Sequence, residues 1–452
     1  MAKGLIIAGL GGGSGKSVVA VGLCRALKEM GREVTPYKKG PDYIDAGWLE
    51  KAAGRPCYNL DPYLMDARTI RASFARHLSD SGLAIIEGNR GLFDGVDASG
   101  GYSTAELARI LDLPVVLVVD CTKTTRTVAA MVLGCLRLEE DLDIAGVVLN
   151  RIGTERQRQL ITEAVETYAG VPVLGAVFRS REDAFPQRHL GVTPGPEHIG
   201  AEAAVVRLAK RIREQIDCEK ILGLMGDCPA AEDSGSGRER SSGLRVGVIR
   251  DSAFQFYYPD NLEQLAASGA ELVEIDATRA SSLPELDALY IGGGFPETNG
   301  ALLAENRSFR DDLKIMARAG LPVYAECGGL IFLGESIEAS GVVYPMCGVL
   351  PIRFSMQRRP QAHGYTELLT ERENPFYPPG LIIRGHEFRY SRVEHWDGRD
   401  TDLVFAVKRG TGFSGGRDGV LRDRVLALYT HVHGLATPQW AEGVITAAGK
   451  KG

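Results

Sequence analysis

The sequence has no long hydrophobic run. No segment reaches roughly 18 consecutive apolar residues, the length required of a membrane-spanning helix. Residues 1–4 lead directly into a strand pattern, without the apolar core of a signal peptide. We therefore expect a cytoplasmic protein that does not enter a membrane.

Paired cysteines and an excess of positive charge are also absent. The eight cysteines are scattered without a C-x-x-C pair, so neither a zinc site nor a disulfide framework is predicted. The 52 basic and 58 acidic residues give a net charge of -6, which argues against nucleic acid as a partner. The 452 residues, of which 44% are hydrophobic, suffice for two or three buried cores.

A glycine-rich loop follows the first predicted strand. Residues 5–8 are apolar, residues 9–17 read GLGGGSGKS, and an amphipathic helix is predicted over residues 18–30. This order predicts a P-loop, although five residues separate Gly9 from Gly15, one more than in the common pattern. Its backbone N–H groups would bind phosphates, the lysine would reach the outer phosphates, and the last hydroxyl would ligate magnesium. The predicted nucleotide-binding residues here are Gly9, Gly11, Gly12, Gly13, Ser14, Gly15, Lys16 and Ser17.

Charged residues follow the next two predicted strands. The segment KKGPDYID at residues 38–45 comes after a strand, and Glu87 ends the apolar strand at residues 83–87. Ligands of open α/β sheets bind at the carboxyl ends of the strands. We therefore expect Glu87 to face the P-loop as a second magnesium ligand beside Ser17.

A cysteine stands between a strand and a helix in the second half of the chain. Residues 323–325 read as a strand end, residues 326–329 as a tight turn around Cys327, and residues 330–333 as a helix start. This is the geometry of a nucleophile elbow, beside a helix N-terminus that favours thiolates. The glycine turn GGGFPE at residues 292–297 follows another strand, and the N–H groups of Gly294 and Gly328 are predicted to form an oxyanion hole.

A cysteine nucleophile also needs a general base, and a later strand offers two histidines for that role. The strand LALYTHVH ends in His431 and His433, both candidates for a general base.

Residues 218–243 are rich in serine, glycine and charge and have no hydrophobic period, which predicts a linker. The expected domains are residues 1–217 and 244–440.

Taken together, these motifs resemble a known family. GGGFPE, AECGGL and YTHVHG are similar to motifs of the class I glutamine amidotransferase domain of the cobyrinate and cobyric acid synthase type. KKGPDYID, GRPCYNLDP and GLFDG resemble segments of the amidoligase half of that family. The resemblance implies an α/β protein, with an N-terminal P-loop parallel-sheet domain and a C-terminal flavodoxin-like class I amidotransferase domain.

The resemblance also implies roles in the second domain. Cys327 would attack the side-chain amide of glutamine, with His431 first in rank as the base and His433 as the fallback. Many class I amidotransferases carry an acid two residues after the base, but His433 occupies that position here. The acid that would orient the histidine is thus missing from its usual place.

In the first domain, the resemblance implies a site for nucleotide, metal and substrate. It places Asp42 and Asp45 at their junction, with Asp45 as a metal ligand, and turns Tyr43 toward the substrate. Asp94 would position or activate a substrate carboxylate. Asn150, at the end of a further strand, would lie where the nucleotide base binds.

The implied reaction is an ATP-dependent, glutamine-hydrolysing amidation of the a- and c-acetate carboxylates of cobyrinic acid, through an acyl phosphate. The segment EGNRGL departs from the family's usual EGVMGL, and its Arg90 suggests a more acidic substrate. The first alternative is therefore sirohydrochlorin, its nickel chelate or siroheme. A second is a nucleotide-gated binding or switch ATPase with an inactive glutaminase.

The expected ligands are ATP, Mg²⁺, L-glutamine and a tetrapyrrole polycarboxylate. Neither nucleic acid nor a membrane is expected as a partner. The sequence leaves the oligomeric state open, with a homodimer as one expectation.

Overall fold

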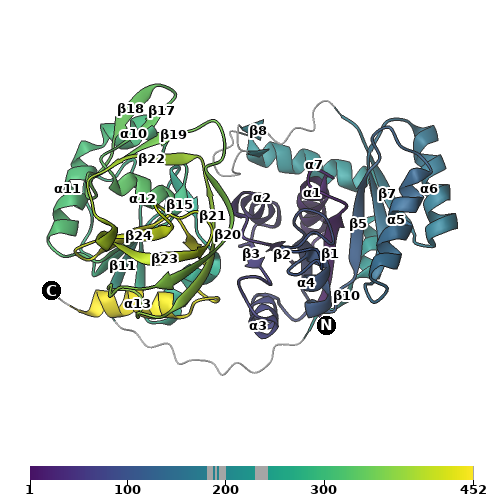
Figure 1. Cartoon of the computed structure of the whole chain (residues 1–452). Helices are drawn as coiled ribbons and strands as arrows, with labels where there is room; N and C mark the ends of the chain where they lie inside the picture. The colour runs from purple at the N-terminus through teal and green to yellow at the C-terminus, as the bar shows by residue number, and fades with distance from the viewer. Residues whose placement is uncertain (181–186, 189–190, 193–199, 230–242, 451–452) are drawn as a thin grey trace. The chain divides into compact units, whose positions relative to one another are not determined.

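The structure is a computed structural model that describes residues 1–180, 187–188, 191–192, 200–229 and 243–450 (Figure 1). The chain divides into two compact units, Met1–Gly235 and Ser236–Gly452. Each unit has its own sheet and its own hydrophobic core. Over the described ranges, no helix has both the length and the apolar character that crossing a membrane requires.

The N-terminal unit is built on a mostly parallel sheet of order β3-β2-β4-β1-β5-β6-β7, with β10 antiparallel to β1. Beyond β1 the chain first fills one side of the sheet, with β2, β3 and β4, and then the other side, with β5, β6 and β7. The loop after β1 therefore opens where the strand order reverses, which is where ligands of such sheets bind. The strands are β1 (Lys3–Gly9), β2 (Val34–Lys39), β3 (Tyr58–Leu60), β4 (Leu83–Glu87), β5 (Val115–Asp120), β6 (Ile144–Ile152), β7 (Val173–Phe178) and β10 (Gly226–Asp227).

Helices bury both faces of this sheet, which explains why its strands read as continuous apolar runs. One core cluster joins strand residues to α1, α2, α7 and α8, and α1 lies beside α7 (Figure 1). The helices are α1 (Lys16–Glu29), α2 (Tyr43–Ala53), α3 (Ala67–His77), α4 (Thr104–Leu111), α5 (Thr127–Leu138), α6 (Glu155–Ala169), α7 (Ala201–Gln215) and α8 (Cys218–Leu224). A further short pair comprises β8 (Gln187–Arg188) and β9 (Gly191–Val192).

The linker was predicted to span residues 218–243, and its predicted start at residue 218 is wrong. Residues Cys218–Leu224 form α8, and β10 pairs with β1, so the first part of this segment belongs to the N-terminal unit. Cys218 and Ile221 are buried there. A helix of seven residues is too short to show a hydrophobic period in the sequence. Residues 230–242 of the predicted linker lie outside the described residues.

The C-terminal unit contains a ten-stranded sheet whose first five strands are parallel. These five follow the spatial order second, first, third, fourth and fifth, which confirms the predicted flavodoxin-like arrangement. They are β13 (Glu271–Ile275), β11 (Arg245–Ile249), β14 (Ala288–Ile291), β16 (Val323–Glu326) and β25 (Val425–Leu428). An antiparallel extension adds β24 (Arg417–Arg422), β23 (Leu403–Arg409), β20 (Ala362–Thr370), β21 (Ile382–Arg389) and β26 (His431–Val432).

Smaller elements complete the C-terminal unit. A four-stranded sheet has the order β18-β17-β19-β22, and β12 pairs with β15. The strands are β12 (Phe254–Phe256), β15 (Gly293–Gly294), β17 (Ser336–Ala339), β18 (Val342–Pro345), β19 (Ile352–Met356) and β22 (Ser391–Trp396). The helices are α9 (Pro259–Ala267), α10 (Gly300–Glu305), α11 (Arg307–Arg318), α12 (Gly328–Leu333), α13 (Gln439–Gly449) and a 3₁₀ turn, η2 (Asp400–Asp402).

Candidate active sites

The P-loop leads from β1 into α1 and holds its lysine against the backbone. Nζ of Lys16 donates hydrogen bonds to the carbonyl oxygens of Gly11 at 3.0 Å and Arg90 at 2.6 Å. Gly15 precedes the helix in the left-handed region, with φ of 97°. A β-carbon there would lie 1.9 Å from Nδ2 of Asn150, so only glycine fits.

Three side chains from different elements converge beside the loop. The Ser17 hydroxyl donates to Oε1 of Glu87 at 2.7 Å and lies 3.4 Å from Oδ2 of Asp45. Because β4 lies between β1 and β2 in the sheet, the carboxyl ends of these strands bring the three residues together. All three of the predicted metal ligands therefore meet at one point.

A buried lysine completes this group. Nζ of Lys38 lies 2.9 Å from Oδ2 of Asp45 and 3.0 Å from Oε1 of Glu87. Burial opposes its charge, but the two carboxylates outweigh burial and raise the pKa of Lys38. Burial also raises the pKa of Glu87 to about 7, against the opposing effect of Lys38.

The oxygen atoms of this group fit a magnesium ion. Oε2 of Glu87 is buried and has no hydrogen-bond partner in the described part of the chain, and the same holds for Oγ of Ser14. Such an orphaned carboxylate oxygen costs free energy unless a ligand satisfies it. Hydroxyl and carboxylate oxygens are the ligands that Mg²⁺ prefers.

Asp42 and Tyr43, two predicted substrate residues, lie at the start of α2. Oδ1 of the half-buried Asp42 accepts the N–H groups of Ile44 at 2.8 Å and Asp45 at 2.9 Å, which caps α2. Burial raises the pKa of Asp42 to about 6, and the neighbouring Asp45 adds to this effect. Tyr43 is the first residue of α2 and is half-buried.

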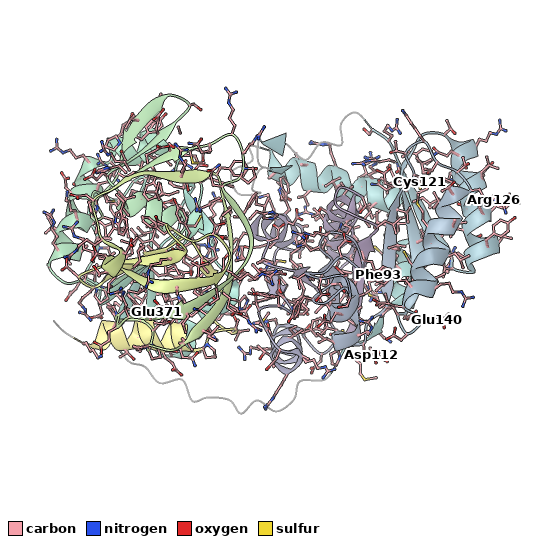
Figure 2. The ribbon with its side chains drawn as sticks, in the orientation of Figure 1. Phe93, Asp112, Cys121, Arg126, Glu140 and Glu371 are labelled. Carbon is pink, nitrogen blue, oxygen red and sulfur yellow. The ribbon has the colours of Figure 1, made fainter. Side chains whose placement is uncertain are left out.

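Asp94 and Arg90 lie on the loop after β4. Oδ2 of Asp94 accepts the N–H of Gly91 at 2.8 Å, so this carboxylate stabilises the turn. The loop can be followed in Figure 2 at the label of Phe93. Arg90 has a left-handed backbone, with φ of 52°, and its side chain is exposed although its carbonyl oxygen holds Lys16.

Asn150, at the end of β6, contacts the P-loop. Its Nδ2 donates to the carbonyl oxygen of Ser14 at 2.8 Å. This amide therefore ties the end of β6 to the loop between β1 and α1. The contact is compatible with the predicted place near the nucleotide, since the loop is the predicted phosphate site.

Cys327 forms a sharp turn between β16 and α12. Its φ of 46° and ψ of -94° lie outside the regions that non-glycine residues usually adopt. The N–H of Cys327 donates to the carbonyl oxygen of Leu428 at 2.8 Å, and its carbonyl oxygen accepts from Ile331 at 3.1 Å. Backbone strain of this kind is typical of a nucleophile elbow.

The two glycine turns that were predicted to form an oxyanion hole lie against each other. A β-carbon on Gly328 would lie 2.9 Å from the backbone nitrogen of Gly294. The N–H of Gly329 donates to the carbonyl oxygen of Gly292 at 3.1 Å, which holds the turns together. Only a residue without a side chain permits this approach.

His431 lies between the thiol and a carboxylate. Its ring neighbours the side chain of Cys327, and Nδ1 lies 3.3 Å from Oε2 of Glu326. Burial disfavours the charged ring, but the hydrogen bonds to Cys327 and Glu326 raise the pKa of His431 to about 10. The ring of His386 stacks on it, with centroids 4.9 Å apart.

His433 has different surroundings. Its fully buried ring packs on Tyr258 with centroids 4.4 Å apart, and neither ring nitrogen has a hydrogen-bond partner among the described residues. Nε2 lies 3.6 Å from Oδ2 of Asp260, beyond hydrogen-bond range. Burial lowers the pKa of His433 to about 3. These contacts favour His431 over His433 as the base.

Comparisons with known proteins follow the same division of the chain. Residues 5–192 match the CobQ/CobB/MinD/ParA nucleotide binding domain, and residues 245–439 match the CobB/CobQ-like glutamine amidotransferase domain. A cobyrinate a,c-diamide synthase of Magnetococcus marinus is 40% identical over 95% of this chain and 93% of its own. One of Archaeoglobus fulgidus is 40% identical over 99% and 98%, and one of Syntrophotalea carbinolica is 38% identical over 98% and 97%.

The chain belongs to the cobyrinate a,c-diamide synthase family. It is a glutamine-hydrolysing carbon–nitrogen ligase with a nucleotide-binding domain and a glutamine amidotransferase domain. This assignment confirms the resemblance found in the sequence. It also disfavours the alternative of a binding module with an inactive glutaminase.

Two charged residues of these sites, Lys38 and Glu326, were not predicted from the sequence. Lys38 was noted only as part of a charged segment, and Glu326 only as part of a turn. The contact of Lys38 with Glu87 joins the neighbouring strands β2 and β4, and the contact of Glu326 with His431 joins β16 to the segment that follows β25. The signal that could have found them is a charged residue in an apolar strand, since such residues are rarely buried without a partner.

Arg126, which precedes α5, packs against a neighbouring helix. Cys121 and Arg126 lie on the segment from β5 to α5 (Figure 2). The guanidinium carbon of Arg126 lies 4.5 Å from the centroid of the Tyr168 ring, on α6. This cation–π contact joins the start of α5 to α6 at the surface.

Proposed function

We propose that this enzyme uses ATP and glutamine to convert the a- and c-acetate carboxylates of cobyrinic acid into amides, in two successive reactions. The observation that carries the proposal is the presence, in one chain, of the Ser17–Glu87–Asp45 cluster and the Cys327–His431 contact. Ammonia has no use in a nucleotide switch, whereas an activated carboxylate consumes it. The acceptor is taken from the name shared by the relatives described above.

The first half of the proposed reaction releases ammonia. The thiolate of Cys327 attacks the side-chain carbonyl carbon of glutamine, and the N–H groups of Gly294 and Gly328 stabilise the oxyanion. His431 passes a proton to the departing nitrogen, which leaves as ammonia and a glutamyl thioester remains. Water, deprotonated by His431, then hydrolyses the thioester to glutamate and restores the thiol.

The second half activates the acceptor. A substrate carboxylate oxygen attacks the γ-phosphorus of ATP, which gives an acyl phosphate and ADP. The P-loop amides and Lys16 hold the phosphates and offset the negative charge that develops. Ammonia then attacks the acyl carbon, phosphate leaves, and loss of a proton gives the amide.

Ser17, Glu87 and Asp45 would hold magnesium in this site. A bound Mg²⁺ supplies charge neutralisation between the phosphate oxygens. Lys38 keeps the two carboxylates close to each other without occupying Oε2 of Glu87. These residues thus position the metal ligands before nucleotide arrives.

A second acceptor class has one observation in its favour. The backbone carbonyl oxygen of Arg90 accepts a hydrogen bond from Lys16, and its side chain is exposed, so the loop beside the predicted phosphate site carries an additional cation. An additional cation suits an acceptor with more carboxylates. Sirohydrochlorin, its nickel chelate and siroheme are therefore the second candidates.

Mass spectrometry of the products tests the proposal. The enzyme is incubated with MgATP, glutamine and, separately, cobyrinic acid, sirohydrochlorin, nickel sirohydrochlorin and siroheme. Two successive losses of about one mass unit, as each hydroxyl is replaced by an amino group, are expected with cobyrinic acid. Diamidation of a sirohydrochlorin derivative alone would select the second class, and amidation of none would overturn both.

A further inference from the structure

The glutaminase site lacks an acid at the position where many class I amidotransferases have one. His433 stands two residues after His431, and its buried ring packs on Tyr258 instead of contacting the base. A histidine that acts as a base still needs a partner for its second nitrogen, because that partner fixes the tautomer and ring orientation. The structure offers such a partner from another strand.

Glu326 supplies two contacts to the segment that carries the base. Its Oε2 lies 3.3 Å from Nδ1 of His431, and its Oε1 accepts the N–H of Val432 at 3.2 Å. The carboxylate is fully buried and the histidine is 3% exposed. The hydroxyl of Tyr290 also lies 3.5 Å from Oε2. The carboxylate therefore holds both the ring and the backbone of this segment.

The sheet register explains how a residue beside the nucleophile reaches the base. Glu326 pairs with Leu428 where β16 and β25 run in parallel. The chain continues from Leu428 for three residues to His431, across the carboxyl end of β16. Glu326 and Cys327 are adjacent in sequence, so their side chains approach the same imidazole from one turn.

We propose that Glu326, the residue immediately before the nucleophile, is the positioning residue that orients His431 in the glutaminase reaction. Nδ1–H of His431 donates to Oε2 of Glu326, which leaves Nε2 for the thiol of Cys327. The carboxylate also stabilises the imidazolium that forms when the thiol gives up its proton. This inference rests on the glutaminase half of the proposed function and not on the identity of the acceptor.

His386 also packs against His431 but does not offer this interaction. The stacked ring of His386 is another titratable neighbour of His431. Burial lowers the pKa of His386 well below its usual value, so this ring is neutral. Its Nδ1 lies 3.2 Å from the hydroxyl of Tyr258.

The test is the Glu326→Gln variant, assayed by glutamate formation from glutamine so that the acceptor plays no part. The amide keeps an acceptor for Val432 N–H but removes the charge from Nδ1. We expect kcat for glutaminase to fall about 10²- to 10⁴-fold, as for loss of the orienting acid in a catalytic triad. The alkaline limb of the pH profile should move to lower pH, because the imidazolium loses its stabilising charge.

Asp418→Asn is the matched control. Asp418 is also fully buried and holds the same segment, through the N–H groups of Tyr429 at 3.2 Å and Thr430 at 3.3 Å. Its carboxylate accepts hydrogen bonds from Gly419, Tyr429 and Thr430 and not from a histidine of the described residues. The alkaline limb of the pH profile of the Asp418→Asn enzyme should stay at the wild-type pH, even if its rate changes. A Glu326→Gln enzyme whose rate falls with the limb unmoved would show a purely structural role and overturn the proposal.

A second variant covers the case in which Glu326→Gln does not fold. Glu326→Asp keeps the charge on a shorter side chain that no longer reaches Nδ1, so kcat should fall at least about 10-fold. A rate within about twofold of wild type in either variant would refute the role of Glu326. Amidation with added ammonium should be retained in both variants, and its absence from the wild type would refute the proposed function instead.

Discussion

Lys38 and Glu87 form an ion pair in the interior of the N-terminal unit, with 3.0 Å between Nζ and Oε1. Both side chains are about 1% exposed. Lys38 also pairs with Asp45, so a single ammonium lies between two of the three predicted metal ligands. The pair links the stability of the sheet to the geometry of the predicted magnesium site.

Replacing Lys38 by methionine should destabilise the N-terminal unit by about 3–5 kcal/mol, because it leaves two carboxylates without their counter-charge. Urea unfolding without nucleotide measures this change. Lys210→Met is the control, since the Lys210–Glu214 pair is exposed on α7 and should contribute less than about 1 kcal/mol. A loss of under about 1 kcal/mol for both variants would contradict the expectation.

Replacing Glu87 by glutamine should weaken magnesium binding. The amide keeps the hydrogen bond from Ser17 but removes the negative charge and one anionic oxygen. With ammonium as the nitrogen donor, the Mg²⁺ concentration for half-maximal amidation should rise at least about 10-fold. An unchanged magnesium requirement would remove Glu87 from the ligand set. The rate of glutamate formation should be far less affected.

Replacing Cys327 by alanine should abolish amidation with glutamine and leave amidation with added ammonium, because only ammonia release needs the thiol. Cys347→Ala is the control. It removes another buried cysteine of the same unit, whose pKa is raised by burial, and should retain both activities. Loss of ammonium-dependent amidation in a folded Cys327→Ala enzyme would contradict the two-site scheme.

His433 should make the C-terminal unit sensitive to acid. Its folded pKa of about 3 lies below the usual value of about 6.5, so the unfolded chain binds an additional proton between these values. The contribution of the neutral His433 to the free energy of unfolding is therefore fully present above pH 6.5 and is lost as the pH falls toward 3. At pH 5 the loss is about 2 kcal/mol. The nearby Asp260 favours the charged ring, which makes this figure an upper value.

The His433→Phe variant measures this effect. Phenylalanine can keep the packing on Tyr258 and cannot be protonated, so the difference in unfolding free energy between pH 7.5 and pH 5 should shrink by up to about 2 kcal/mol. Its glutaminase activity should also survive, whereas His431→Phe should lose it. Loss of activity in a stable His433→Phe enzyme would reverse the ranking of the two histidines.

Much of both sites could be predicted because their motifs are local. The P-loop, the turn at Cys327 and the glycine turn at Gly294 each lie within a few residues of a predicted strand end. Strand, turn and helix are specified by short-range periodicity and glycine placement. The expected order of strands and helices was confirmed for the same reason, while the linker boundary failed where a short helix has no period.

The sequence by itself determined which residues can act: the loop that binds phosphate, the cysteine at a strained turn and the strand that ends in two histidines. Only the tertiary structure decided which side chains meet, since strand order sets the contacts between Lys38 and Glu87 and between Glu326 and His431. These pairs are separated by 49 and 105 residues in the chain. Side-chain contacts of that range follow from sheet register, which no local pattern encodes.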